Sequence, residues 1–205
     1  MYNYKAQKKK MLSYNESLKI LKETNALLEG HFILSSGLHS DKYVQCAKLL
    51  SFPKKAESIC FSLSEKIKKN TNKIDLILSP AIGGIVIGYE IGRRLNVETI
   101  FAERLDGKLV LRRGFEIPKD SNVLIVEDVI TTGKSALECI EIIKMNKSNL
   151  VACACIIDRT DKNLLFKYKI ISQIKLEINT YKENELPTNL KEMTPIKPGS
   201  RNLSK

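Results

Sequence analysis

Two adjacent carboxylates follow a short apolar run in the middle of the chain, and a series of hydroxyl groups follows the carboxylates. Residues 123–126 are apolar, and Glu127 and Asp128 come next. The string continues through Val129, Ile130, Thr131, Thr132, Gly133, Lys134 and Ser135. Carboxylates accept hydrogen bonds from hydroxyl groups, so the pair suits a ribose 2,3-diol. The hydroxyls, the glycine and the start of a helix suit a phosphate. The string therefore predicts a site for a ribose 5-phosphate.

Two other interpretations of this string account for less of it. The letters Gly-Lys-Ser end the phosphate loop of many ATPases, but that loop needs a glycine five positions before Gly133, where this chain has Asp128. An acidic cap on an ordinary helix explains one aspartate or threonine, but not the whole string directly after a buried strand. We therefore prefer the ribose phosphate site.

Strands and helices that alternate along the chain must position these residues. Short apolar runs predict strands at 74–78, 99–102, 123–126 and 150–157. Helical patterns lie between them, and the helix after the carboxylates is expected over 134–145. This alternation predicts an α/β fold with a mostly parallel sheet and helices on both faces. Such sheets bind ligands at the carboxyl ends of their strands, where the two carboxylates stand.

The N-terminal part of the chain gives its own pattern. A helix is expected from Ser17 to Leu28, ending at Gly30, and a second helix begins at Pro53. Short strands are expected at 32–34 and 43–46, on either side of a polar turn.

Glycines at positions 84, 88 and 92 are spaced one helical turn apart. Gly88 and Gly92 are expected to leave a bare helix face that lies close to the sheet. Gly83 and Gly84 stand at the turn from strand to helix, where backbone amides can form a cradle for an anion.

Length, charge and cysteine content set further limits. The 205 residues suit one domain, and the net charge of +11 comes from lysines spread along the chain, which predicts solvated faces rather than a nucleic-acid surface. The five cysteines include no CxxC pair, which predicts buried free thiols rather than disulfides or a zinc site. Neither a membrane-spanning run nor a secretion signal is visible. We therefore expect a cytoplasmic protein without membrane or nucleic-acid partners, whose residues 1–13 form a mobile basic tail.

The string from Val123 to Ser135 resembles the signature with which type I phosphoribosyltransferases bind phosphoribosyl pyrophosphate (PRPP). The resemblance implies the fold of that family, a mostly parallel central sheet flanked by helices with a small N-terminal hood. It implies that residues 14–205 form a single domain with two parts. The core comprises about 51–175, and the hood comprises about 14–50 together with the C-terminal segment. It also implies Mg²⁺ as the cofactor, carried mainly by PRPP rather than by protein ligands.

Other segments are similar to the orotate branch of this family. They are the hood segment 32–46, the pyrophosphate loop 79–84, the mobile-loop segments 101–108 and 111–115, the strand end 156–159 and the C-terminal segment 197–201. This similarity implies transfer of the phosphoribosyl group from PRPP to orotate in pyrimidine (UMP) biosynthesis, with Thr131 and Arg159 binding orotate. A planar guanidinium binds a carboxylate through two parallel hydrogen bonds, although Arg159 could instead pair with Asp158 or Asp161 at the surface.

The resemblance also implies which residues act in catalysis. Asp128 would hold the ribose as positive charge develops on it, and Arg104 and Lys108 would stabilise the leaving pyrophosphate from a loop that closes over the site. The family implies a homodimer in which each loop reaches the neighbour's active site. A purine phosphoribosyltransferase and an RNA-binding regulator with the same fold are the alternatives, and the hood and Arg159 favour orotate.

The chain departs from the family pattern in three places. Ser35 stands where many members have a lysine, and the mobile loop lacks the usual histidine and has fewer lysines. Residues 185–188 replace a cysteine pair that some relatives carry near the C-terminus. His31 and His39 lie in the hood segment and are expected to make structural hydrogen bonds rather than to act in catalysis.

Overall fold

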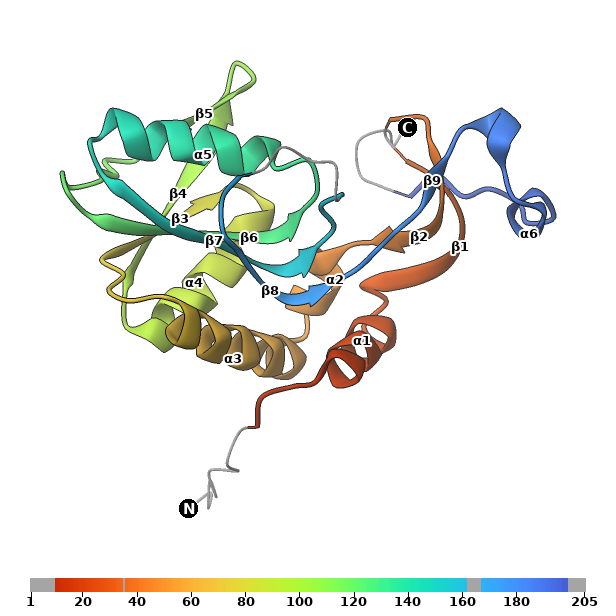
Figure 1. Cartoon of the computed structure of the whole chain (residues 1–205), viewed down its shortest axis with the longest axis horizontal. Coiled ribbons are helices and arrows are strands. Elements are labelled where there is room, and N and C mark those ends of the chain that lie inside the picture. Colours follow the sequence, from red (N-terminus) through yellow and green to blue (C-terminus); the bar gives the residue numbers. More distant parts are fainter. Residues whose placement is uncertain (1–9, 35, 162–166, 199–205) are drawn as a thin grey trace.

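A six-stranded sheet forms the centre of the computed structural model, which describes residues 10–34, 36–161 and 167–198 (Figure 1). Its strands lie in the order β5-β4-β3-β6-β7-β8. They are β3 (Leu76–Pro80), β4 (Glu98–Leu105), β5 (Lys108–Leu111), β6 (Asn122–Ile130), β7 (Asn149–Asp158) and β8 (Ile170–Lys175). All neighbours pair in parallel except β4 and β5, which form an antiparallel hairpin. The predicted mostly parallel α/β sheet is confirmed.

Helices cover both faces of this sheet, as predicted. Helices α3 (Pro53–Asn70) and α4 (Gly83–Leu95) lie on one face and α5 (Lys134–Met145) lies on the other (Figure 1). Leu124 and Val126 of β6 join the core cluster on the α3 and α4 side, whereas Val123 and Ile125 join the cluster under α5. Burial on both faces explains why the strand is apolar without alternation.

Two glycines bring α4 close to the sheet. A Cβ atom on Gly88 would lie 2.1 Å from Ser79 Oγ, and one on Gly92 would lie 2.0 Å from Thr99 Oγ1. The predicted bare helix face is therefore confirmed. Close packing fixes the start of α4 beside the carboxyl end of β3.

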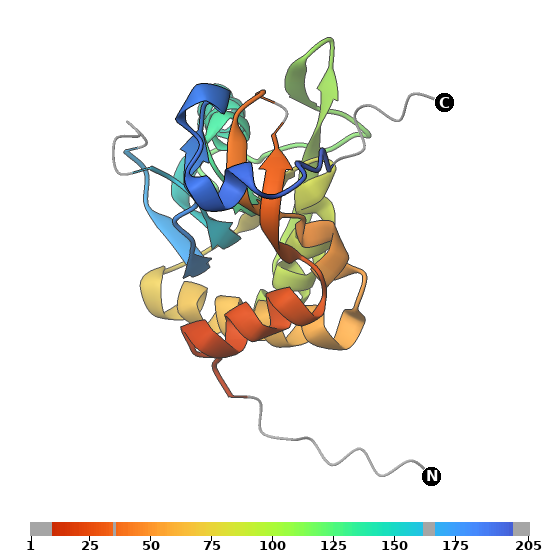
Figure 2. The same cartoon turned by 90° about the vertical axis from the view of Figure 1, so that its right-hand side faces the viewer.

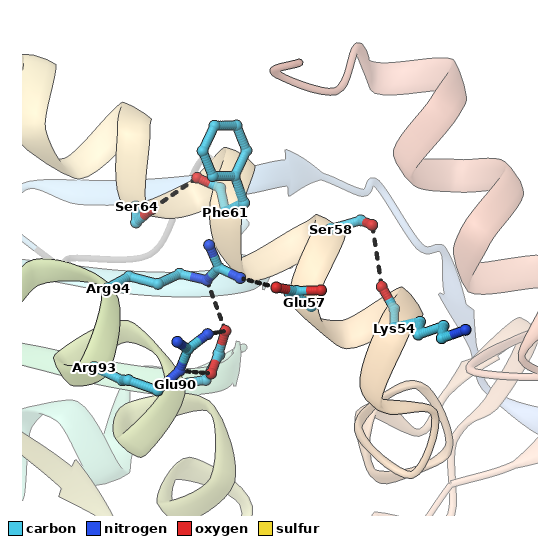
Figure 3. Close-up of polar contacts among 8 residues, drawn as sticks. All are labelled: Lys54, Glu57, Ser58, Phe61, Ser64, Glu90, Arg93 and Arg94. Carbon is cyan, nitrogen blue, oxygen red and sulfur yellow. Dashed lines mark hydrogen bonds and ion pairs between the residues drawn. The ribbon is translucent and has the colours of Figure 1, made fainter. Parts of the chain in front are cut away.

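An ion-pair network joins α3 to α4 on the outer surface of this layer (Figure 3). Arg94 Nε donates to Glu90 at 2.7 Å, and Arg94 Nη2 lies 3.3 Å from Glu57. The guanidinium also lies over the Phe61 ring, 5.7 Å from its centroid. These contacts lie on the helices rather than at the strand ends, so they stabilise the scaffold.

A second, three-stranded antiparallel sheet stands at the end of the molecule toward which the parallel strands point (Figures 1 and 2). We call it the hood; its order is β1 (Leu27–Ile33), β2 (His39–Val44) and β9 (Thr180–Tyr181). Because β9 comes from the C-terminal segment, the hood joins both ends of the chain. The short helices around it are α1 (Tyr14–Glu23), α2 (Cys46–Leu50), η1 (Glu183–Glu185) and α6 (Thr188–Lys191).

The two histidines hold the hood together. His31 Nε2 and His39 Nδ1 are 2.6 Å apart, and His31 Nδ1 lies 3.1 Å from the Met193 carbonyl oxygen. Both side chains are buried. They therefore have the structural hydrogen-bonding role that was predicted for them.

The predicted helix from Ser17 to Leu28 is wrong at both ends. The side chain of Ser13 caps α1 reciprocally with Glu16, so α1 begins at Tyr14. It stops at Glu23, and Asn25 adopts a left-handed conformation with φ 53° before β1 begins at Leu27. Gly30 lies within β1, at an interruption of its pairing with β2, where a helix end was expected.

Other expectations differ from the structure in their bounds. In the predicted tail 1–13, residues 1–9 lie outside the described residues, whereas Leu12 N–H donates to Ser62 Oγ at 3.0 Å. Cys46 begins α2 instead of ending a strand.

All five cysteines are free and buried, as predicted. Within the described ranges, no helix has the length and apolar composition needed to cross a membrane.

Candidate active site

The predicted phosphate-binding string spans the end of β6 and the start of α5. Strand β6 continues to Ile130, so both carboxylates lie within the carboxyl-terminal half of the strand. Residues 131–133 then lead into the helix. Gly133 has φ 72°, which favours glycine, and it caps α5 without a side-chain hydrogen bond. Thr131, Thr132 and Lys134 are exposed. The start of α5 therefore lies beside exposed side chains, and its Lys134 N–H donates to Thr132 Oγ1 at 3.4 Å. Helix starts of this kind favour anions.

Glu127 and Asp128 have different surroundings. Glu127 interacts with the Ser135 hydroxyl on α5 and with Arg104 on β4. Asp128 lies against the start of α4, where a Cβ atom on Gly83 would be only 2.7 Å from its Oδ1. The two carboxylates thus flank the end of β6, one toward each helix layer.

Burial raises the pKa of both carboxyl groups. For Glu127, burial and the neighbouring Asp128 raise the pKa to about 8, although the Ser135 hydroxyl and Arg104 act in the opposite direction. For Asp128, burial raises the pKa while the backbone amides of Val129 and of Asp128 itself oppose the rise. A ligand that brings positive charge or hydrogen-bond donors to these two carboxyl groups would favour their charged forms.

The loop between β3 and α4 passes close to this pair. Ala81 N–H donates to the Ala102 carbonyl at 2.7 Å, which fixes the loop against β4. A Cβ atom on Gly84 would lie 3.0 Å from the Val126 carbonyl oxygen, so a larger residue here would crowd the backbone of β6. The predicted pyrophosphate loop therefore lies beside Asp128.

Arg159 lies at the same edge, directly after β7. Its backbone N–H donates to the Ile130 carbonyl at 2.8 Å, which places it next to the end of β6. Its Nε is buried and has no hydrogen-bond partner among the described residues. Asp158, one of the two alternative partners, instead accepts hydrogen bonds from Thr160 and lies 3.6 Å from Lys175 Nζ. A buried Nε–H without a partner needs an acceptor, which a ligand can supply.

Cys46 is a neighbour of the site that the sequence did not indicate. Its buried Sγ lies 3.9 Å from the Asp128 carbonyl oxygen, 82 residues along the chain. Burial, and next the charge of Asp128, raise the pKa of this thiol, so it remains protonated at neutral pH. Cys46 starts α2 directly after the hood, and it therefore packs the hood segment against β6.

The hairpin of β4 and β5 carries the two predicted cations for the leaving group. Lys108 is exposed at its tip, whereas the Arg104 guanidinium pairs with Glu138 of α5 at 3.0 Å. The segment 101–108, expected as a mobile loop, is thus mostly strand. Ser35 and residues 199–201 lie outside the described residues.

Two cavities among the described residues lie away from these strand ends. One of about 440 Å³ lies behind the hood and is lined by residues of α1, β1 and β2 together with Lys175, Leu176 and Glu177. None of the predicted site residues lines it. The converging polar groups at the strand ends, rather than cavity size, therefore locate the candidate site.

Known proteins resemble this chain in sequence and in fold. A family model described as the phosphoribosyl transferase domain matches residues 52–192. Orotate phosphoribosyltransferases of Caldicellulosiruptor bescii and Caldicellulosiruptor saccharolyticus are both 47% identical to the chain, over 90% and 91% of its length and 96% of theirs.

Solved structures share the fold. The orotate phosphoribosyltransferase from Aeropyrum pernix gives a TM-score of 0.66 at 24% identity and covers 77% of this chain and 92% of its own. The adenine phosphoribosyltransferase from Thermoanaerobacter pseudethanolicus gives 0.56 at 21% identity, covering 66% and 88%. At these identities the likeness concerns the fold alone.

The fold, the string on β6 and α5, and the match over 52–192 define a phosphoribosyltransferase of type I. Within that class the chain belongs to the orotate phosphoribosyltransferase family, to which its 47% identical relatives belong. The predicted fold class and family are confirmed.

Proposed function

We propose that the protein transfers the phosphoribosyl group of PRPP to orotate, giving orotidine 5-phosphate and pyrophosphate in the synthesis of UMP. One arrangement carries the proposal: Glu127 and Asp128, the start of α5 and the unpartnered Nε of Arg159 lie at the same sheet edge. The first two suit a ribose phosphate, and the third suits a planar carboxylate.

In this proposal PRPP lies across the end of β6. Its 2- and 3-hydroxyls donate hydrogen bonds to Glu127 and Asp128. Its 5-phosphate accepts hydrogen bonds from the backbone amides of 131–135 and from the hydroxyls of Thr131, Thr132 and Ser135. The Gly83 and Gly84 loop contacts the pyrophosphate, because glycine lets its backbone approach Asp128 and β6 closely.

The site is compatible with Mg²⁺ that arrives with PRPP. Glu127 and Asp128 offer carboxylate oxygens, the ligand type that Mg²⁺ prefers, at the end of β6. Because the described residues contain no group of three candidate metal ligands, we assign no protein ligand set. When bound, Mg²⁺ supplies positive charge to the pyrophosphate oxygens.

The chain's own residues then position the two reactants. As the bond from the ribose carbon to pyrophosphate breaks, that carbon gains positive character, which the carboxylate of Asp128 favours. Arg159 and Thr131 orient orotate so that its ring nitrogen faces that carbon. Lys108, exposed at the hairpin tip, offers positive charge to the departing pyrophosphate. Because orotate is already an anion, positioning and charge stabilisation account for most of the catalysis.

Turnover tests this function directly. With Mg²⁺ and PRPP, the protein should consume orotate, measured as loss of its ultraviolet absorbance, and adenine, hypoxanthine and uracil should react poorly. Faster turnover of a purine would make the protein a purine phosphoribosyltransferase and overturn the role of Arg159. RNA binding without turnover of any base would instead indicate a regulator.

We also propose that the enzyme acts as a homodimer in the cytoplasm. The α4 helix and the loop before it expose Ile82, Val86 and Tyr89 at one-turn spacing, with exposed fractions of 86%, 53% and 67%. Such an apolar stripe suits an isologous contact with a second copy. The five free buried cysteines suit a reducing compartment.

Mixed dimers test whether the active sites are shared. If Asp128→Asn and Lys108→Ala each inactivate the enzyme, then exchanging subunits between the two variants should restore activity. One site would combine an intact ribose pocket with an intact hairpin from the other chain. If each hairpin serves its own subunit, activity should not return, even when labelled subunits prove that the two variants have exchanged subunits.

A further inference from the structure

The β4–β5 hairpin is a tight ribbon that projects beyond the sheet in both views (Figures 1 and 2). Asp106 and Gly107 form its two-residue turn, with φ values of 49° and 82°, as type I′ turns require. The register pairs Arg104 with Leu109 and Leu105 with Lys108. A two-stranded ribbon is marginally stable in water, so its position depends on additional contacts.

One carboxylate on α5 supplies those contacts. Glu138 Oε2 accepts the Leu109 backbone N–H at 3.0 Å, and its two oxygens accept the Arg104 guanidinium at 3.0–3.2 Å. Arg104 Nη1 also donates to the Gly107 carbonyl at 2.7 Å. Glu138 thus fixes both strands and, through Arg104, the turn.

These contacts differ from an ordinary surface ion pair, which contributes little. The guanidinium uses both Nη atoms, and a backbone amide completes the carboxylate's partners. Burial acts to raise the pKa of Glu138, but Arg104 and the Leu109 amide outweigh it, so the pKa is lowered and the carboxylate is charged at neutral pH.

The cations of the hairpin are therefore not equivalent. Arg104 is held by Glu138, whereas Lys108 makes no ion pair with any residue that the structure describes. Glu138 stands three residues after Ser135 on α5, so it lies about one turn from the proposed phosphate contacts. The helix that receives the phosphate also sets the position of the hairpin.

We propose that Glu138 is a positioning residue that acts through Arg104 to hold the β4–β5 hairpin, which carries Lys108. The proposal rests on the proposed function. It gives Arg104 a different role from the direct pyrophosphate contact predicted from the sequence.

Four variants test the clamp: Glu138→Gln, Arg104→Gln, the double variant, and Glu141→Gln as the control. Glu141 lies on the same helix and forms an exposed pair with Lys144, away from the hairpin. If Arg104 acts only through Glu138, each single variant should lower kcat by about tenfold, and the double variant should lose no more than either single variant. The KM for orotate should stay within twofold, and the control should match the wild type.

Hydrogen exchange gives a readout that does not require activity. Exchange of the Leu109 amide, followed in the ligand-free protein, should become about tenfold faster in Glu138→Gln because its acceptor is weakened. The control should leave it unchanged. Thermal unfolding should confirm that every variant is folded.

Two results would overturn the proposal. A far larger kcat loss in Arg104→Gln than in Glu138→Gln, or additive losses in the double variant, would mean that Arg104 itself touches the pyrophosphate. An unchanged Leu109 exchange rate in Glu138→Gln would mean that no clamp exists. If the wild type fails to turn over orotate, the proposed function fails, while the exchange experiment still decides whether Glu138 holds the hairpin.

Discussion

Replacing Glu127 with glutamine should change how the stability of the ligand-free protein depends on pH. Glutamine keeps the shape and a hydrogen-bonding oxygen but cannot ionise. In the folded protein, burial and Asp128 raise the pKa of Glu127 from its ordinary 4.5 to about 8. Between about pH 4.5 and pH 8, the Glu127 carboxyl therefore stays protonated in the folded protein, whereas it is ionised in the unfolded chain. Stability must fall as the pH rises through this window.

The size of the effect follows from the pKa. One pH unit corresponds to 1.36 kcal/mol, so a rise from 4.5 to about 8 sets an upper limit of roughly 5 kcal/mol. Glu127 keeps some contact with solvent, which reduces the expectation to about 2–3 kcal/mol. For a chain of this length, that corresponds to a shift of roughly 4–12 °C in melting temperature.

Urea unfolding from pH 5 to pH 9, at constant protein concentration and without ligands, measures this dependence. The free energy of unfolding of the wild type should fall by about 2–3 kcal/mol more than that of Glu127→Gln. The two proteins should be similar near pH 5, and the variant should be the more stable near pH 9. Asp75 does not interfere, because its pKa of about 2 lies below the window.

The exposed Glu141→Gln variant is the matched control and should keep the wild-type slope. Parallel pH profiles for the wild type and Glu127→Gln would refute the reasoning, because Glu127 would then ionise alike in the folded and unfolded chains.

Three further predictions concern other parts of the molecule. Gly88→Ala should lower the free energy of unfolding by about 1–3 kcal/mol in denaturant titrations, because its Cβ would meet Ser79 Oγ, and adding Ser79→Ala should recover part of the loss. Equal stabilities of the single and double variants would contradict this contact. The Lys73 ammonium and nearby amide groups lower the pKa of Asp75 to about 2, so the wild type should lose more stability than Asp75→Asn as the pH falls from 4 to 2 in acid titrations. Arg159→Ala should raise the KM for orotate at least tenfold while changing that for PRPP much less, and equal changes in steady-state kinetics would indicate a structural role.

Sequence alone determined the features that are local in the chain. The apolar run before Glu127, the glycine at 133 and the helical pattern after it lie next to one another, so they predicted the presence of β6 and the bounds of α5, Lys134–Met145, although β6 continues four residues beyond the predicted end, to Ile130. The glycine spacing predicted the close face of α4 for the same reason, because a helix places every fourth residue on one side.

Short elements with weak periodicity were missed. Strand β5 has four residues and β9 has two, and neither shows an alternation that identifies a strand by itself. Leu27 and Leu28 continue the helical spacing of α1, yet pairing with Val44 and Tyr43 makes them part of a strand. Long-range hydrogen bonds outweighed the local preference there.

Tertiary structure alone decided how the site residues are partnered. Gly83 meets Asp128, Cys46 meets the Asp128 carbonyl, and Glu138 holds Arg104, although each pair is separated by at least 34 residues. The raised pKa of Glu127 and the unpartnered Nε of Arg159 likewise depend on which groups lie nearby after folding. Residue type determines which hydrogen bonds a side chain can donate or accept. Its charge state and the groups that it actually contacts depend on burial and on residues distant in sequence. That environment exists only once the sheet, the helices and the hood have packed together.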